Sequence, residues 1–205
     1  MDTWQLVATE RSRLAGGLSA LGASEWNESS LCPGWRNRDV LADVVSTAET
    51  TADRFFVGMI RNGFRFHEMS ANTAAALAGQ STEQLLDRLR AGISSHVKPP
   101  GPVASVLLEA VVHGEDVMHP LGKSIAHSDE GLVGALEFGK DAQSLVGCEK
   151  RIARLSLRAT DVNWSTCERP EVSGPATALL LAMCGRKAAL DSLSGPGVVV
   201  LQNRP

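Results

Sequence analysis

Residues 103–118 limit the fold of this chain more than any other segment, because most of their positions are apolar. A helix that is apolar nearly all round is normally buried inside a protein. Glu109, His113 and Asp116 interrupt this pattern at spacings of four and three residues, which places their side chains on one side of the helix. The fold must therefore either bury this polar stripe with partners or turn it to solvent.

A buried carboxylate needs a partner, because an isolated charge is costly to remove from water. A carboxylate and an imidazole one helical turn apart, such as Glu109 and His113, can bind the same cation. Zn, Mn, Fe and Ni all accept this pair of donors. Spacing alone is equally compatible with a hydrogen-bonded Glu–His pair or a solvated face, and it identifies no third ligand.

The remaining pattern predicts a mainly α protein, α+β overall. Apolar residues recur at helical spacing, or helix start signals occur, in most of the chain before residue 148, while short alternating runs follow it. We therefore predict a helical domain over residues 1–148 and a small α/β domain over residues 149–205. The predicted helices are 4–21, 38–60, 81–94, 103–118, 130–146 and 175–184, and the predicted strands are 151–159 and 198–201.

Composition narrows the classes of function. The net charge of −3 and the lack of a basic stripe argue against a nucleic-acid partner. No apolar run is long enough to span a membrane, and the N-terminus lacks the apolar core of a secretory signal. The four cysteines form no CxxC pair, which is typical of free thiols in a cytoplasmic protein.

Three segments together resemble one known family. Residues 31–42, LCPGWRNRDVLA, are similar to the first motif of the mycothiol-dependent maleylpyruvate isomerase family. Glu109, His113 and Asp116, followed by the Pro-Leu-Gly of residues 120–122, resemble its second motif, and residues 174–195 resemble its small C-terminal domain. The resemblance covers most of the chain and keeps the order of the segments.

The resemblance implies a DinB-like four-helix bundle with a metal in its core, followed by a small α/β domain. Family members bind the metal through a histidine of the first motif and the Glu and His of the second. Here the first position is Asp43, which on its own lies on a polar helix face typical of solvated surface. An Asp43, Glu109 and His113 set is more anionic and would shift the preference from Zn toward Mn, Fe or Ni, or weaken binding.

The resemblance also assigns roles outside the ligand set. Asp116 would orient His113, and Arg186 would offer a guanidinium to an anionic substrate, although it is equally a cation at a helix C-terminus. Cys32 could be a reactive thiol, but its loop position favours packing.

The function predicted in this way is that of a cytoplasmic isomerase or S-transferase that uses a divalent metal and mycothiol. Such an enzyme activates a low-molecular-weight thiol for addition to an electrophilic small molecule. Two alternatives stay open. One is a non-catalytic binding protein with a degenerate metal site, and the other is a metal-dependent hydrolase that activates water.

Overall fold

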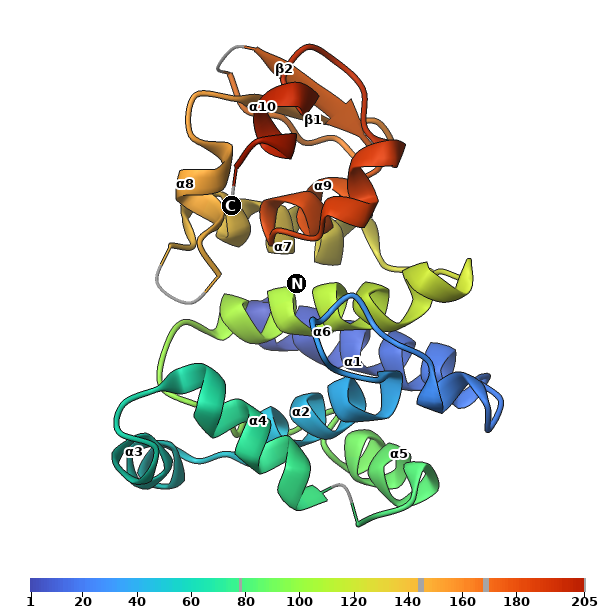
Figure 1. The fold of residues 1–205 in the computed structure, drawn as a ribbon, viewed down its shortest axis with the longest axis vertical. Helices are drawn as coiled ribbons and strands as arrows, with labels where there is room; N and C mark the ends of the chain where they lie inside the picture. The colour runs from blue at the N-terminus through green and yellow to red at the C-terminus, as the bar shows by residue number, and fades with distance from the viewer. Residues whose placement is uncertain (78, 144–145, 168–169, 205) are drawn as a thin grey trace. The chain divides into compact units, whose positions relative to one another are not determined.

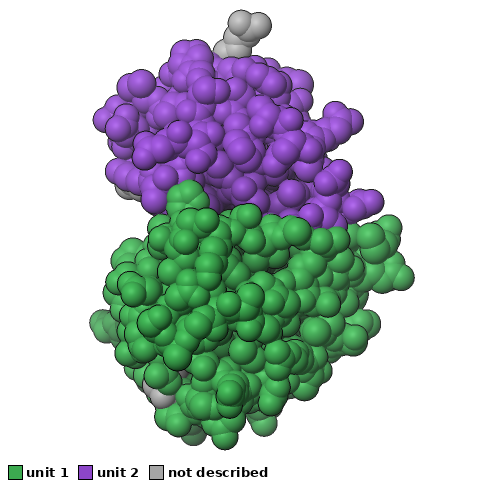
Figure 2. Space-filling view, turned by 90° about the vertical axis from the view of Figure 1, so that its right-hand side faces the viewer, with its two compact units in different colours: residues 1–126 green, residues 127–205 purple. Residues whose placement is uncertain are grey.

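The computed structural model describes residues 1–204 except 78, 144–145 and 168–169, and it leaves out the side chains of residues 66, 67, 70, 71 and 74. The chain forms two compact units, Met1–Ala126 and His127–Pro205, which Figure 2 shows in different colours. The change of composition near residue 148, where we predict a domain boundary, therefore lies inside the second unit.

The first unit is helical (Figure 1). Helix α1 packs against α5 and α6, and α2 packs against the same two helices, so these four enclose one core. Helix α4 lies against α2, and α3 contacts α4 at the edge of the unit. The helices are α1 (Thr3–Ser19), α2 (Asn37–Glu49), α3 (Ala52–Arg61), α4 (Phe66–Leu77), α5 (Thr82–Ala91) and α6 (Val103–Met118), and the 3-10 turns are η1 (Glu25–Asn27) and η2 (His119–Leu121).

Burial of aliphatic side chains holds these helices together. Each fully buried leucine or valine contributes about 1.5–3 kcal/mol relative to an exposed one. Helix α6 is central to this core, which confirms that the apolar segment 103–118 is buried. The core includes Leu14, Leu18, Leu41, Val44, Val45, Leu85, Leu89, Ala110, Val117 and Met118.

The predicted helix over residues 38–60 is wrong in one respect, because the chain breaks it into α2 and α3. Thr50 and Thr51 adopt extended backbone angles between the two helices. The Thr50 hydroxyl donates to the carbonyl of Ser46 at 2.8 Å. The Thr50 amide donates to the carbonyl of Thr47, three residues earlier, so the regular helix pattern ends there. Beyond the break no residue of α3 is buried, so only the α2 part of the apolar pattern over residues 38–60 lies in the core.

The second unit combines short helices with a small sheet (Figure 1). Strands β1 (Ser156–Ala159) and β2 (Glu171–Gly174) pair in parallel, with Ser156 opposite Glu171 and Ala159 opposite Gly174. Helix α9 (Ala176–Met183) is buried along its length and contacts α7 (Asp129–Asp141), α8 (Cys148–Ile152) and both strands. The turn η3 (Lys187–Ser192) and helix α10 (Val198–Gln202) complete the unit.

The mainly α fold with a small C-terminal α/β part is confirmed, but both strand predictions in this unit need correction. Residues 151–152 belong to α8, and the positive φ of 60° at Arg154 separates that helix from β1. Residues 198–201 form helix rather than strand. Ser194 already pairs with Ser173 beside β2, and the Gly197 amide donates to the Glu171 carbonyl, so the valines that follow have no strand to join.

Within the described part of the chain, no helix has the length and apolar character needed to cross a membrane.

Candidate metal site

The polar stripe of α6 has partners in the fold and is at least half-buried: Asp116 is buried, while Glu109 and His113 are half-buried. Asp116 is fully buried, and its Oδ2 lies 2.9 Å from Nδ1 of His113 one turn earlier. The His113 side chain keeps 18% of its surface exposed, so one edge of the ring remains accessible. The ring therefore has one nitrogen held by a buried carboxylate and the other, Nε2, directed elsewhere.

Helix α2 supplies a second carboxylate at that free nitrogen. Oδ2 of Asp43 lies 3.6 Å from Nε2 of His113. One potential ligand atom from each of Asp43, Glu109 and His113 lies within 4.8 Å of the other two. The helix contact that packs α2 on α6 thus brings together the three residues predicted as metal ligands.

The placement of Asp43 overturns the interpretation of its helix face as solvated. Asp43 is only 8% exposed, and it faces the core side rather than water. Thr47, one turn later, makes a side-chain hydrogen bond with Glu109, and this bond lowers the pKa of that carboxyl. The polar residues of α2 at these two positions therefore face the polar stripe of α6.

Cys32 is the residue that sequence reasoning did not connect to the site. Its Sγ donates to Oδ2 of Asp116 at 3.1 Å and lies 3.8 Å from Nδ1 of His113. Cys32, His113 and Asp116 form a second group whose donor atoms are close enough to hold a cation. Residue spacing gives no signal for this contact, because 84 positions separate Cys32 from Asp116.

Burial and charge set the ionisation of the site. Burial raises the pKa of Glu109 to about 7, and the negative charge of Asp43 adds to this effect, while His113 opposes it. Burial lowers the pKa of His113, but its hydrogen bonds to Asp116 and Cys32 outweigh this, so the pKa is well above its usual value. The site thus concentrates carboxylates whose charge favours a cation in their midst.

Arg11 on α1 is a buried cation near this cluster. It is 1% exposed, and its Nη1 donates to the carbonyls of Gly92 and Ser95, both at 3.0 Å. Its charge lowers the pKa of Glu109, while its Nη2 has no hydrogen-bond partner among the described residues. Arg11 therefore ties α1 to the segment after α5 and contributes positive potential near Glu109.

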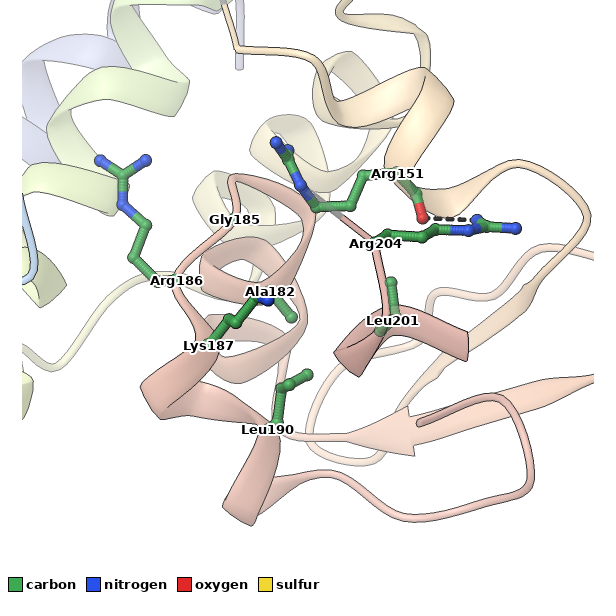
Figure 3. Close-up of a pocket in the computed structure, with 8 residues that line it drawn as sticks. All are labelled: Arg151, Ala182, Gly185, Arg186, Lys187, Leu190, Leu201 and Arg204. Atoms are coloured by element: carbon green, nitrogen blue, oxygen red, sulfur yellow. Dashed lines mark hydrogen bonds between the residues drawn. The ribbon is translucent and has the colours of Figure 1, made fainter. Parts of the chain in front are cut away.

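Arg186 lies in the second unit, just after α9. Its Nη1 donates to the carbonyl of Cys184 at 2.8 Å. Arg186 also lines a small pocket with Arg151 and Arg204, but Figure 3 shows the three guanidinium groups pointing in different directions. Arg204 is engaged with the Arg151 and Ala153 carbonyls. The predicted contact of Arg186 with an anionic substrate stays a prediction.

The first unit has four helices around one core, and an imidazole and two carboxylates meet between α2 and α6. This arrangement defines a helical protein with a candidate metal site. Residues 7–98 match the family model of the mycothiol maleylpyruvate isomerase N-terminal domain. They include Cys32 and Asp43 and end before α6. This part of the chain is similar to that domain, and the resemblance predicted from the motifs is confirmed.

Two solved structures have a similar fold. A histidine-to-alanine mutant of the mycothiol-dependent maleylpyruvate isomerase is 15% identical, with a TM-score of 0.61 over 95% of this chain and 91% of that chain. The mycothiol-dependent maleylpyruvate isomerase is 14% identical, with a TM-score of 0.58 over the same shares. Identities this low establish a shared fold alone. The comparison with curated proteins gave no match.

Proposed function

We propose that this protein is a divalent-metal-binding enzyme of the mycothiol-dependent isomerase or S-transferase type, working in the cytoplasm on an electrophilic small molecule. The observation that carries the proposal is the convergence of Asp43, Glu109 and His113. The family domain over residues 7–98 and the fold of the two isomerase structures support the choice of reaction class.

The three residues fit a catalytic rather than a closed structural metal site. They offer two carboxylates and one imidazole, a donor set that leaves coordination positions for a further ligand. His113 presents Nε2 to Asp43, while its Nδ1 is held by Asp116. Metal-binding histidines commonly donate their second ring N–H to a carboxylate in this way, which fixes the ring and its tautomer.

The proposed chemistry is addition of a thiol to an electrophile. When bound, a divalent metal would lower the pKa of the thiol and hold it as the nucleophilic thiolate. Asp43, Glu109 and His113 would hold that metal, and Asp116 would keep Nε2 of His113 free of its proton. Arg186 would bind an anionic group of the substrate.

Asp43 sets the metal preference in this proposal. The family motif has histidine at this position, so the carboxylate makes the set harder and adds one negative charge. A set rich in oxygen donors favours Mn and Fe, whereas a set with two imidazoles favours softer metals such as Zn. We propose Mn or Fe as the physiological metal, with Zn and Ni as competitors.

Metal content tests the ligand set directly. We expect about one metal ion per chain after reconstitution of the purified protein, and loss of that ion in Asp43→Asn and Glu109→Gln. Glu115→Gln is the matched control, because Glu115 is buried on the same helix but accepts the Ile125 amide at 3.1 Å instead of facing the cluster. Binding unchanged in the two ligand variants would refute the ligand set.

Turnover tests the reaction class separately. The reconstituted protein is assayed with maleylpyruvate in the presence and absence of mycothiol, before and after chelation of the metal. The proposal requires consumption that depends on both. Metal-dependent consumption of maleylpyruvate without a thiol would favour a hydrolase. Tight, metal-independent binding of maleylpyruvate or mycothiol without turnover would favour a binding protein. Either result would overturn the proposed function.

A further inference from the structure

Two hydrogen bonds, donated by neighbouring residues of one loop, hold Cys32 next to the candidate site. The amide of Leu31 donates to the backbone carbonyl of Asp116 at 2.9 Å, and the Cys32 thiol donates to Oδ2 of the same residue at 3.1 Å. The loop itself is closed by the Cys32 amide, which donates to Oγ of Ser30, and by the Trp35 amide, which donates to the Cys32 carbonyl. The thiol therefore has a fixed position relative to α6.

Oδ2 of Asp116 is the shared acceptor of this arrangement. It lies 2.9 Å from Nδ1 of His113 and 3.1 Å from Sγ of Cys32, and Asp116 has no exposed surface. A buried carboxylate oxygen with two donors cannot rotate away from one without losing the other. The thiol thus restrains the oxygen that in turn orients the imidazole.

We propose that Cys32 is a positioning residue of the metal site: its thiol fixes Oδ2 of Asp116 so that His113 keeps its proton on Nδ1 and presents Nε2 to Asp43. This role rests on the proposed function, because it concerns the same ligand set. Cys32 does not touch the proposed metal or the substrate in this role. It acts mainly through its bond to Oδ2 of Asp116, beside a longer contact of its sulfur with Nδ1 of His113 at 3.8 Å.

The competing interpretation is that Cys32 only fills space in the core, where the residue is 9% exposed. The two interpretations separate on a pair of substitutions. Cys32→Ser keeps a hydroxyl donor but is more polar and smaller, whereas Cys32→Val keeps an apolar side chain of similar size but donates nothing. If Cys32 is a positioning residue, the His113 ring of Cys32→Ser should resemble the wild type more closely than that of Cys32→Val. If Cys32 only packs, Cys32→Val should resemble the wild type more closely.

The first readout needs no metal. Nitrogen-15 shifts of the His113 ring, recorded on the metal-free full-length protein in alkaline buffer, report which nitrogen carries the proton. We expect the Nδ1–H form to dominate in the wild type and in Cys32→Ser, and the second tautomer to become populated in Cys32→Val. Equal tautomer populations in all three proteins would overturn the proposal. If the valine variant does not fold, Cys32→Ala takes its place.

The second readout is the affinity for Mn²⁺, measured by calorimetry. Loss of an outer-shell partner of a metal-bound histidine typically lowers affinity about 10–100-fold. Because Cys32 lies one bond further out, we expect Cys32→Val to lower it by about 3–10-fold and Cys32→Ser to recover most of the loss.

In an Asp116→Asn background the difference between the serine and valine variants must become smaller, and a difference of undiminished size there would overturn the proposal. If the wild type binds no metal at all, the proposed function fails, while the tautomer measurement still decides the role of Cys32.

Discussion

Glu109 should destabilise the metal-free protein, and replacing it with glutamine should relieve that cost. The pKa of this carboxyl rises from its usual 4.5 to about 7, chiefly because the side chain is buried. Each pKa unit corresponds to about 1.4 kcal/mol, so the ionised carboxylate costs the folded state about 3 kcal/mol. Glutamine keeps the shape and can still accept the hydrogen bond from Thr47, but it carries no charge.

The sign of the effect follows from the order of the two pKa values. Below the unfolded pKa of 4.5 the carboxyl is protonated in both states, and Glu109 and glutamine are nearly equivalent. As the pH rises toward 7 the unfolded chain releases the proton while the folded chain retains it, so the wild type loses stability over this window. We therefore expect Glu109→Gln to be about 3 kcal/mol more stable at about pH 8 and equally stable at about pH 4.

Chemical denaturation followed by circular dichroism, with a chelator present, measures this difference. Glu115→Gln is the control, since its carboxylate already accepts the Ile125 amide at 3.1 Å and its neutralisation should bring no gain. On adding Mn²⁺ the ranking should reverse, because only the wild type gains stability from bound metal. A Glu109→Gln protein that is no more stable than the wild type at either pH would refute the desolvation argument.

Three further outcomes follow from the site and the core. Asp43→His should move the preference from Mn²⁺ toward Zn²⁺, measured by competition between the two ions, because an imidazole replaces an oxygen donor. Asp116→Asn should lower metal affinity about 10–100-fold with the fold intact by circular dichroism, because His113 loses its carboxylate partner at 2.9 Å. Leu157→Ala, at a fully buried position of β1, should cost about 2–5 kcal/mol in denaturation while Mn²⁺ affinity stays unchanged, since the ligands lie in the other unit.

Local patterns predicted the elements whose cause is local. The segment 103–118 coincides with α6, because its apolar composition leaves it no stable place except the core. The capping box of Ser81 and Gln84 begins α5 with both reciprocal bonds in place. In each case a few neighbouring residues contain the whole physical reason for the structure.

Other features depend on partners that no local pattern contains. Val198 to Leu201 have strand propensity, but the position beside β2 is already taken by Ser194, so they form α10. The helix break at Thr50 and Thr51, which adopt extended backbone angles, was likewise concealed by the apolar periodicity of residues 38–60. These differences arise where tertiary context outweighs propensity.

The site residues also differ in whether local sequence patterns could predict them. Two ligands on one helix follow from the spacing of Glu109 and His113, whereas Asp43 appears solvated until α2 is packed against α6. Only the family resemblance pointed to position 43. The contact of Cys32 with Asp116 could be found by neither route, because a bond between residues 84 positions apart follows neither from spacing along a helix nor from the family's ligand positions.

Charge balance links the stability of this site to its proposed use. Without a metal, the cluster holds two carboxylates and draws protons onto itself, as the raised pKa values of Glu109 and His113 indicate. A divalent cation among the same donors would replace those protons, so metal binding must release protons and weaken as the pH falls. The aspartate at position 43 strengthens this dependence, because it adds a negative charge where the family motif has a neutral imidazole. Neutral side chains at these positions would make the metal-free protein more stable but would bind a cation more weakly. Substitutions that neutralise the site should therefore change the stability of the metal-free protein and its metal affinity in opposite directions.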